Sequence, residues 1–458
     1  MGKALKVILM IFVIFVQISL MITYSYDSTN IIMMLFGTSL LLYRITQYKD
    51  LSTCFCSLFM ALSIFLSLQV TALFRMRDSE LQNYSYASYH DLAIFGNELL
   101  VVVLFFDVLF NILIKKKKEA ENIVSGNGKI ISKSTFYVFY VISLGVSLLS
   151  LYFGMSRMGT EDRVILPFHL NGIIYMYRSV LVPYLIFTFV HNRLSNKKEI
   201  SNFEWILIFF YGLVEVYVRM SKSALINVFF PIFVYYIVGK RLNAQSFVKV
   251  VMPVILVFFL LYPVVGALRM EDNISAQKVA DVYKESEGND TGKDIYNRFF
   301  SAGGHYMNCY YLFKDGPFFD FSRLPFVIME RGSAGFYTHV VLGISRDKKH
   351  SSGTTGITDP YLIGGKGFCY LVLILVTLIG VLVDKRIGKS QILHKVLLIQ
   401  IFYTLVLYKN VTIFIDDLFL SFVGTTTIQL FLIFKYRKSY ETRSKVNLRK
   451  IVNVRKDK

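Results

Sequence analysis

A series of apolar runs, each about 20 residues long, alternates with charged segments along most of this chain. A helix of that length crosses the roughly 30 Å hydrocarbon core of a bilayer. Lipid offers peptide groups no hydrogen-bond partner, so each run must satisfy its own backbone as a helix. We therefore predict an all-α polytopic membrane protein with about twelve transmembrane helices. The predicted spans are 5–23, 30–44, 52–74, 92–114, 135–153, 170–190, 203–218, 223–239, 248–268, 363–384, 392–409 and 414–434.

Lysine and arginine set the predicted orientation, because cytoplasmic loops carry an excess of both. They gather after every second span, for example at Lys115, Lys118, Lys385 and Arg386. With about twelve spans these signals alternate without conflict and place both termini in the cytoplasm. The predicted parts are spans one to nine in 1–268, a large outer loop in 269–362, spans ten to twelve in 363–434, and a basic cytoplasmic tail in 435–458.

The net charge of +19 would suggest a nucleic-acid partner in a soluble protein. Here the excess lies in short loops and the tail, where it sets topology and attracts anionic lipid. We therefore predict the lipid bilayer as a partner, and no nucleic acid. The four cysteines lack the spacing of a zinc site, so we expect no metal site among them.

The large outer loop changes character along its length. It begins with a polar part, 271–294, and continues into a part rich in phenylalanine and tyrosine. A mere connector would not need so many rings. We predict that the loop forms a compact cap of short helices on the membrane.

Arg178 lies inside a predicted span, where an ionisable group is expensive and marks a functional site by default. One interpretation pairs it structurally with an acid of the fourth span, Glu98 or Asp107; the other has it face a cavity and bind an anion. Glu215 and Arg219 are four residues apart, a spacing that places them on one helix face as an ion pair.

Cations and aromatic rings coincide on the predicted outer side. Guanidinium groups bind phosphate in a fork geometry, and rings stack on sugar faces. A lipid-linked pyrophosphate sugar at the outer leaflet requires both. The candidate pyrophosphate ligands are Arg163, Arg178, Arg219 and Lys222; the candidate catalytic residues of the cap are Arg298, His305, Arg331, His339 and His350.

Two local motifs and the overall plan resemble the Wzy-type O-antigen and capsular repeat-unit polymerases, with a fold of the GT-C-like polymerase and ligase type. The tip Val218-Arg219-Met220-Ser221-Lys222-Ser223 is similar to the Ser/Arg-rich tip of that family, although it departs from a Ser-Arg-Gly pattern. The glycine-punctuated stretch 353–367 resembles the family's re-entry from the large loop.

The resemblance implies a metal-independent glycosyltransferase without a cofactor in the bacterial cytoplasmic membrane. Such enzymes transfer a growing glycan from undecaprenyl pyrophosphate onto the non-reducing end of a new oligosaccharide repeat unit, which is linked to the same kind of lipid. Arginines would stabilise the leaving pyrophosphate, and a cap histidine or carboxylate would act as the base. A chain-length regulator and a flippase are the implied partners. An O-antigen ligase, a flippase or transporter of the lipid-linked unit, and a membrane scaffold are the alternatives.

Overall fold

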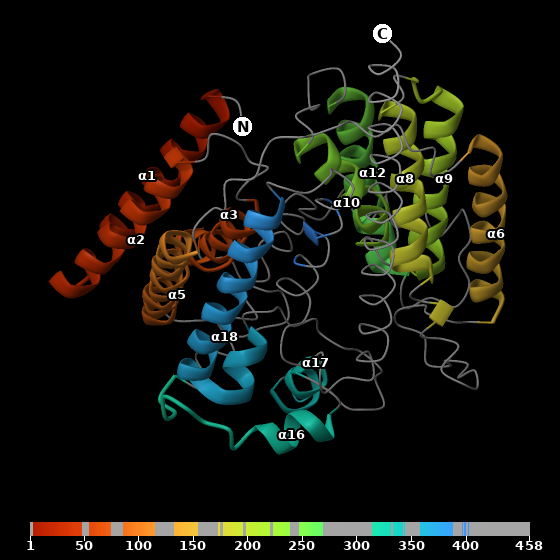
Figure 1. The fold of residues 1–458 in the computed structure, drawn as a ribbon. Coiled ribbons are helices and arrows are strands. Elements are labelled where there is room, and N and C mark those ends of the chain that lie inside the picture. Colours follow the sequence, from red (N-terminus) through yellow and green to blue (C-terminus); the bar gives the residue numbers. More distant parts are fainter. Residues whose placement is uncertain are drawn as a thin grey trace, which may run out of the picture.

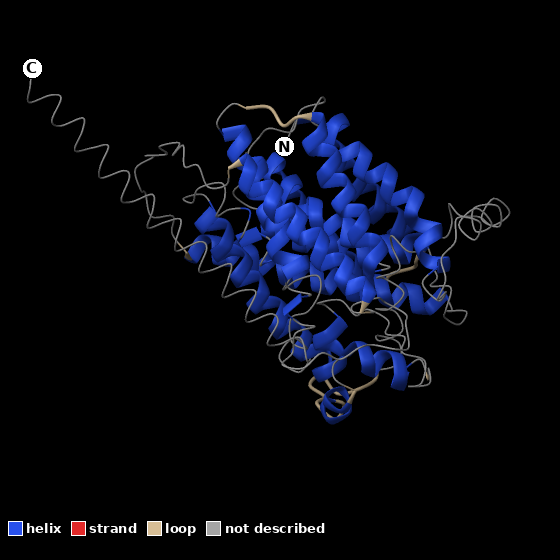
Figure 2. Cartoon of the chain, turned by 90° about the vertical axis from the view of Figure 1, so that its right-hand side faces the viewer, coloured by secondary structure: helices blue, strands red, loops and turns tan. Residues whose placement is uncertain are grey.

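In the computed structural model, every described element is helical, and Figure 2 shows no strand among the described residues. The predicted spans from 5–23 to 363–384 each coincide with a helix. The spans predicted at 392–409 and 414–434 lie almost wholly outside the described residues. Those residues are 3–47, 55–74, 86–114, 132–153, 173–174, 177–195, 198–219, 223–238, 247–268, 314–330, 333–341, 343, 358–387, 396, 398–399 and 402.

The helices pack most extensively within two groups, which Figure 1 shows side by side. In the first group, α18 and α2 pack against α5, and α18 also packs against α3. This group is not continuous in sequence, because the whole second group lies between α5 and its last member, α18. Its members are α1 (Lys3–Thr23), α2 (Ser28–Gln47), α3 (Phe55–Ile64), η2 (Phe65–Val70), α4 (Thr71–Phe74), α5 (Tyr86–Leu113) and α18 (Thr358–Ile387).

The second group is continuous in sequence. Its centre is α10, which packs against α8, α9 and α12, while α6 covers α8 and α9 from the outside. Two of its helices begin with a π-helical turn. The members are α6 (Lys133–Tyr152), η4 (Tyr177–Leu181), α8 (Val182–Ser195), α9 (Asn202–Arg219), α10 (Ser223–Val238), η5 (Phe247–Val251) and α12 (Met252–Leu268).

Among the described residues, five helices are long and apolar enough to cross a membrane, judged by length and composition. Many of their large apolar side chains face outward, which is the opposite of a soluble protein and is expected of a surface that lipid covers. The chain is therefore built as a membrane-embedded protein. The five candidate spans are Lys6–Thr23, Ser28–Gln47, Tyr89–Leu113, Lys133–Tyr152 and Asp359–Lys385.

The start of α18 is broken at Gly365, whose backbone has φ +76° and ψ −168°. Only glycine adopts this conformation readily. The break leaves peptide groups on both sides without their helical partners. A glycine is also needed for space, since a Cβ would come within 3.1 Å of the Phe318 carbonyl oxygen.

Residues 314–330 supply the missing hydrogen bonds. The amide of Asp320 donates to the Gly364 carbonyl at 3.0 Å, and the amide of Gly367 donates to the Phe318 carbonyl at 2.6 Å. Arg323 donates through Nε to the Leu362 carbonyl at 2.8 Å and through Nη2 to the Tyr361 carbonyl at 3.4 Å. A cation at the end of the first half-helix also complements its dipole.

Three short helical elements lie beside this break, within the predicted outer loop. They are α16 (Leu324–Met329), α17 (Ser333–Phe336) and η6 (Tyr337–Val341). Both α16 and α17 pack against α18, at the lower end of the molecule in Figure 1. The described parts of 269–362 are 314–330, 333–341, 343 and 358–362, the last of which already belongs to α18. That the whole loop forms a cap on the membrane stays a prediction.

Gly365→Ala should lower the free energy of unfolding by about 1–3 kcal/mol, because alanine is strained at this φ and ψ. Thermal unfolding of the purified protein in detergent measures the loss. Gly145→Ala is the matched control: Gly145 lies within α6, and an added Cβ would meet nothing within 4 Å. There alanine should leave the melting temperature unchanged or raise it slightly. Equal melting of both variants would show that the break is not required.

Candidate functional site: a buried arginine–glutamate–arginine cluster

Arg178, Glu215 and Arg219 form an ionic cluster in the second group of helices. Arg178 donates through Nε to Glu215 Oε1 at 2.9 Å and through Nη2 to Oε2 at 3.1 Å. Arg219 Nε lies 2.8 Å from Glu215 Oε2. The three side chains are 0%, 1% and 7% exposed. One carboxylate thus holds two guanidinium groups away from solvent.

Two hydroxyl groups complete the surroundings of the carboxylate. Ser147 donates to Glu215 Oε1 at 2.6 Å, and Tyr211 donates to the same oxygen at 3.2 Å. With the two arginines, the carboxylate faces five donor atoms, about as many as its lone pairs can accept. Glu215 is therefore saturated and has no capacity for a further donor.

One buried donor of the cluster, Nη1 of Arg178, has no hydrogen-bond partner among the described residues. A buried donor left unsatisfied costs about 1–3 kcal/mol. An anion at Nη1 would supply the missing acceptor.

Local sequence explains how Arg178 comes to lie here. Pro183 lacks the amide that would bond back to Ser179 in a regular helix. The chain before it forms the π-turn η4, which contains Arg178. Such turns are frequent at functional sites because they re-aim side chains.

A row of buried serines on α6 faces the cluster. Ser143, Ser147 and Ser150 follow each other at intervals of four and three residues, so they share one helix face. Ser143 also meets the hydroxyl of Tyr177, next to Arg178, at 3.0 Å. Small side chains allow α6 to approach α9 and η4 closely.

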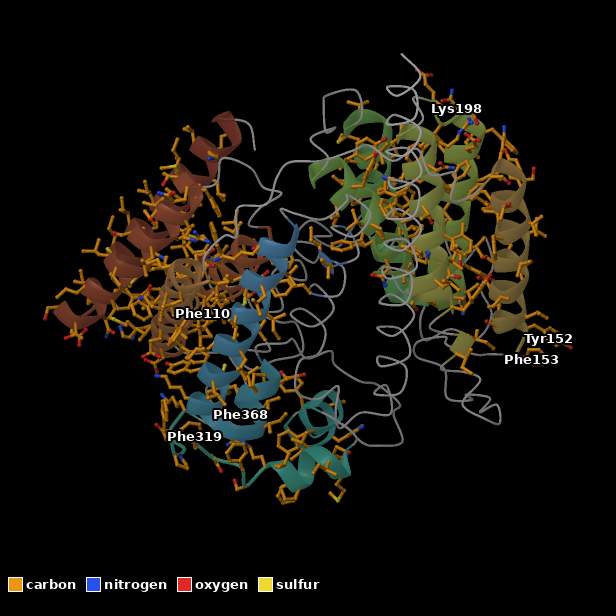
Figure 3. The ribbon with its side chains drawn as sticks, viewed as in Figure 1. Phe110, Tyr152, Phe153, Lys198, Phe319 and Phe368 are labelled. Carbon is orange, nitrogen blue, oxygen red and sulfur yellow. The ribbon has the colours of Figure 1, made fainter. Side chains whose placement is uncertain are left out.

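The cluster lies near one end of the helices. Glu215 is four residues before the end of α9, and Ser147 is five before the end of α6. At 1.5 Å per residue these positions are about 6 to 8 Å inside the helix ends. Figure 3 shows Tyr152 and Phe153 at the same end of the molecule as Phe319, and Lys198 at the opposite end.

At that opposite end α9 begins with a capping box. The Ser201 amide donates to Glu204 at 2.7 Å, and the Glu204 amide donates to the Ser201 hydroxyl at 3.2 Å. Glu204 also meets Arg193 at 3.4 Å and Lys133 at 3.7 Å. These two cations are 23% and 54% exposed, so they reach solvent, unlike Arg178.

The prediction that Arg219 pairs with Glu215 is confirmed. The structural interpretation of Arg178 named the wrong acids. Asp107 instead forms a salt bridge with Arg44, and Glu98 binds Lys366 and the Tyr370 hydroxyl. Both acids belong to α5, in the first group, whereas Arg178 belongs to the second.

The other predicted site residues are not brought to this cluster by the described structure. His339 lies half-buried in η6, which packs most extensively against α17. The remaining candidates lie outside the described residues: Arg163, Lys222, Arg298, His305, Arg331 and His350.

Sequence reasoning missed Ser147 and Tyr211 as partners of Glu215. The spacing of Ser143, Ser147 and Ser150 in an otherwise apolar run was a signal that could have been used, because it marks one polar face of α6. Tyr211 is one helical turn before Glu215 and carries the same kind of signal.

The chain matches no protein-family model, no curated protein and no solved structure. Inference about its activity therefore depends on the residues and their geometry.

Proposed function

We propose that the chain is a membrane glycosyltransferase that polymerises undecaprenyl-pyrophosphate-linked oligosaccharide repeat units into O-antigen or capsular polysaccharide. The observation that carries this proposal is the buried cluster of two arginines on one carboxylate, in which Nη1 of Arg178 has no hydrogen-bond partner among the described residues. A pyrophosphate diester presents several oxygens with the geometry that guanidinium groups prefer.

The reaction assigned to the site is a transfer between two lipid-linked glycans. A hydroxyl oxygen of the acceptor attacks the anomeric carbon of the donor sugar, and the bond from that carbon to the pyrophosphate oxygen breaks. The lipid-linked pyrophosphate leaves, and its oxygen keeps the electron pair of the broken bond. The hydroxyl proton passes to a base. Arg178 and Arg219 would stabilise the charge that develops on the leaving group.

The base and the acceptor site are proposed in the cap. Arg298, His305, Arg331, His339 and His350 are the candidates, of which histidine is suited to proton transfer near neutral pH. Arg163 and Lys222 are proposed as further pyrophosphate ligands. A chain-length regulator and a flippase are proposed partners, and no metal or cofactor takes part in this scheme.

The proposed setting is the bacterial cytoplasmic membrane, with about twelve spans, both termini inside and residues 269–362 as an outer cap. The five membrane-length helices support the setting. The cluster lies toward the end of the molecule that carries α16 and α17, as expected if that end meets the outer leaflet.

Arg178→Lys tests the proposal. Lysine keeps the charge but not the planar fork, so we expect polymer synthesis to fall by about a hundredfold or more. The measurement is the amount and the length distribution of the polysaccharide in the native host, after its own gene for this protein has been deleted and replaced by the variant. Arg44→Lys is the matched control, because Arg44 is also a buried arginine paired with an acid, but in the other group of helices.

The form of the defect separates the competing functions. A polymerase defect leaves single repeat units attached to their final acceptor, whereas a ligase defect abolishes all attachment. A flippase defect leaves lipid-linked units on the inner face of the membrane. Full-length polymer from Arg178→Lys at normal protein level would overturn the assignment of this cluster.

A further inference from the structure

Residues 318–329 carry several exposed apolar side chains, and we call this segment the aromatic lip. Its six outward-facing side chains are between 46% and 62% exposed. Soluble proteins rarely expose so many large apolar side chains together, and such a patch marks an interaction surface. The six are Phe318, Phe319, Phe321, Phe326, Ile328 and Met329.

The charged side chains inside the lip point toward the protein. Arg323 is 8% exposed and binds carbonyl oxygens of α18. Its Nη1 also donates to Asp320 at 2.9 Å, and the Ser322 hydroxyl donates to the same carboxylate at 2.6 Å. The Ser322 hydrogen bonds lower the pKa of Asp320 below its usual value. The charged side chains of the lip thus face inward and its rings face outward, the reverse of a water-exposed loop.

The lip continues the outward face of α18. The exposed residues Leu371, Leu375 and Ile379 recur every four positions, so they form one stripe along this candidate span. Gly367 is the next position of the stripe toward the helix start. There the Phe318 ring takes the place of a side chain, since an added Cβ would lie 2.5 Å from it.

Phe321 covers the neighbouring part of the helix in the same way. Its ring packs edge-on against Phe368 at 5.2 Å between centroids and lies over Gly364. Figure 3 shows Phe319 and Phe368 close together at the lower end of α18. Two backbone hydrogen bonds to Gly364 and Gly367 fix the position of the lip, and therefore of its rings, along the axis of α18.

We propose that the aromatic lip is embedded in the lipid bilayer, with its rings among the acyl chains beside the first turns of α18. The lip is then a membrane-inserted, non-spanning element whose backbone is satisfied by the broken helix, as irregular backbone at membrane depth requires. The occupant of the surface is lipid because the surface continues a stripe on a membrane-length helix. This inference does not depend on the proposed activity.

A tryptophan placed in the lip tests its surroundings. The chain has one tryptophan, so Trp205→Phe gives a dark background in the full-length protein. Phe319→Trp reports on the lip, and Leu375→Trp reports on the exposed stripe of α18. Asp315→Trp reports on the polar start of residues 314–330, just before the lip. Each is reconstituted in phosphatidylcholine vesicles with or without brominated acyl chains, and also titrated with aqueous acrylamide.

Phe319→Trp is expected to lose as much of its emission to brominated lipid as Leu375→Trp does, and to resist acrylamide. Asp315→Trp should show the opposite pattern. Quenching of Phe319→Trp by acrylamide alone would place the lip in water and overturn the proposal. Quenching by neither agent would show that protein covers the lip, either another part of this chain or a second copy, and would also overturn it.

Discussion

Glu215→Ala is expected to destabilise the protein by about 3–5 kcal/mol, because removing one partner of a buried ion pair leaves the other charge uncompensated. The fully buried Arg178 loses its carboxylate partner, and Arg219 loses one of its contacts. The measurement is the midpoint of thermal unfolding in detergent or nanodiscs. Glu215→Gln should lie between the native chain and alanine, since it keeps hydrogen-bond acceptor capacity but not the charge.

The matched control for Glu215 is Glu98→Ala. Glu98 also binds a cation, Lys366, within a membrane-length helix, but the two side chains are 27% and 33% exposed. Partly hydrated pairs contribute about 1 kcal/mol or less. Equal losses for Glu98→Ala and Glu215→Ala would show that water reaches the Arg178 cluster. The double replacement Arg178→Met with Glu215→Leu should recover part of the loss, because apolar side chains can substitute for a buried pair.

Arg323→Ala is expected to be the second most damaging change, with a loss of about 2–5 kcal/mol. The carbonyl oxygens of Leu362 and Tyr361 lose their donor, and a buried acceptor left unsatisfied costs about 1–3 kcal/mol. Asp320 loses its cation as well. The stability of Arg323→Lys should lie between that of the native chain and that of Arg323→Ala, because an ammonium group cannot reach three acceptors in a fork.

The effect of Arg323→Ala should also be local. Without the guanidinium, residues 314–330 lose a main attachment to α18, so a protease should cut there before it cuts the helices. Lys314→Ala is the control in the same segment, since Lys314 meets Asp91 with both side chains 30% exposed. Rapid cleavage of both variants, or of neither, would contradict the role assigned to Arg323.

The helix positions could be predicted from the sequence because each depends on local composition. An apolar run of membrane length specifies a helix whatever surrounds it. The same holds for the Glu215–Arg219 pair, whose spacing alone places both side chains on one face. The break at Gly365 was not predicted, although the glycines at 364, 365 and 367 favour an interruption there.

The partner of Arg178 could not be predicted, because it depends on which helices pack together. Apolar runs of similar length carry little information about their neighbours. Judged by their expected depth in the membrane, Glu98 and Asp107 were as plausible partners of Arg178 as Glu215. The choice is made by the packing of η4 and α9 with α6, where small serines permit a close approach. The role of Arg323 was hidden for the same reason, since its acceptors are backbone oxygens about 40 residues later, exposed only by the break at Gly365.

The two groups of helices differ in when they can be completed during synthesis. The second group, from Lys133 to Leu268, is contiguous, so all its described members have left the ribosome before α18 is translated. The first group must wait: α18 supplies Asp384, whose carboxylate accepts from the Cys56 amide at 3.0 Å, and Lys385, which donates to the Asn111 carbonyl at 3.1 Å. Until α18 is synthesised, α5 and α3 lack the helix that packs against both of them. A truncation after residue 268 would therefore leave the N-terminal helices, rather than those around Arg178, exposed to quality control in the membrane.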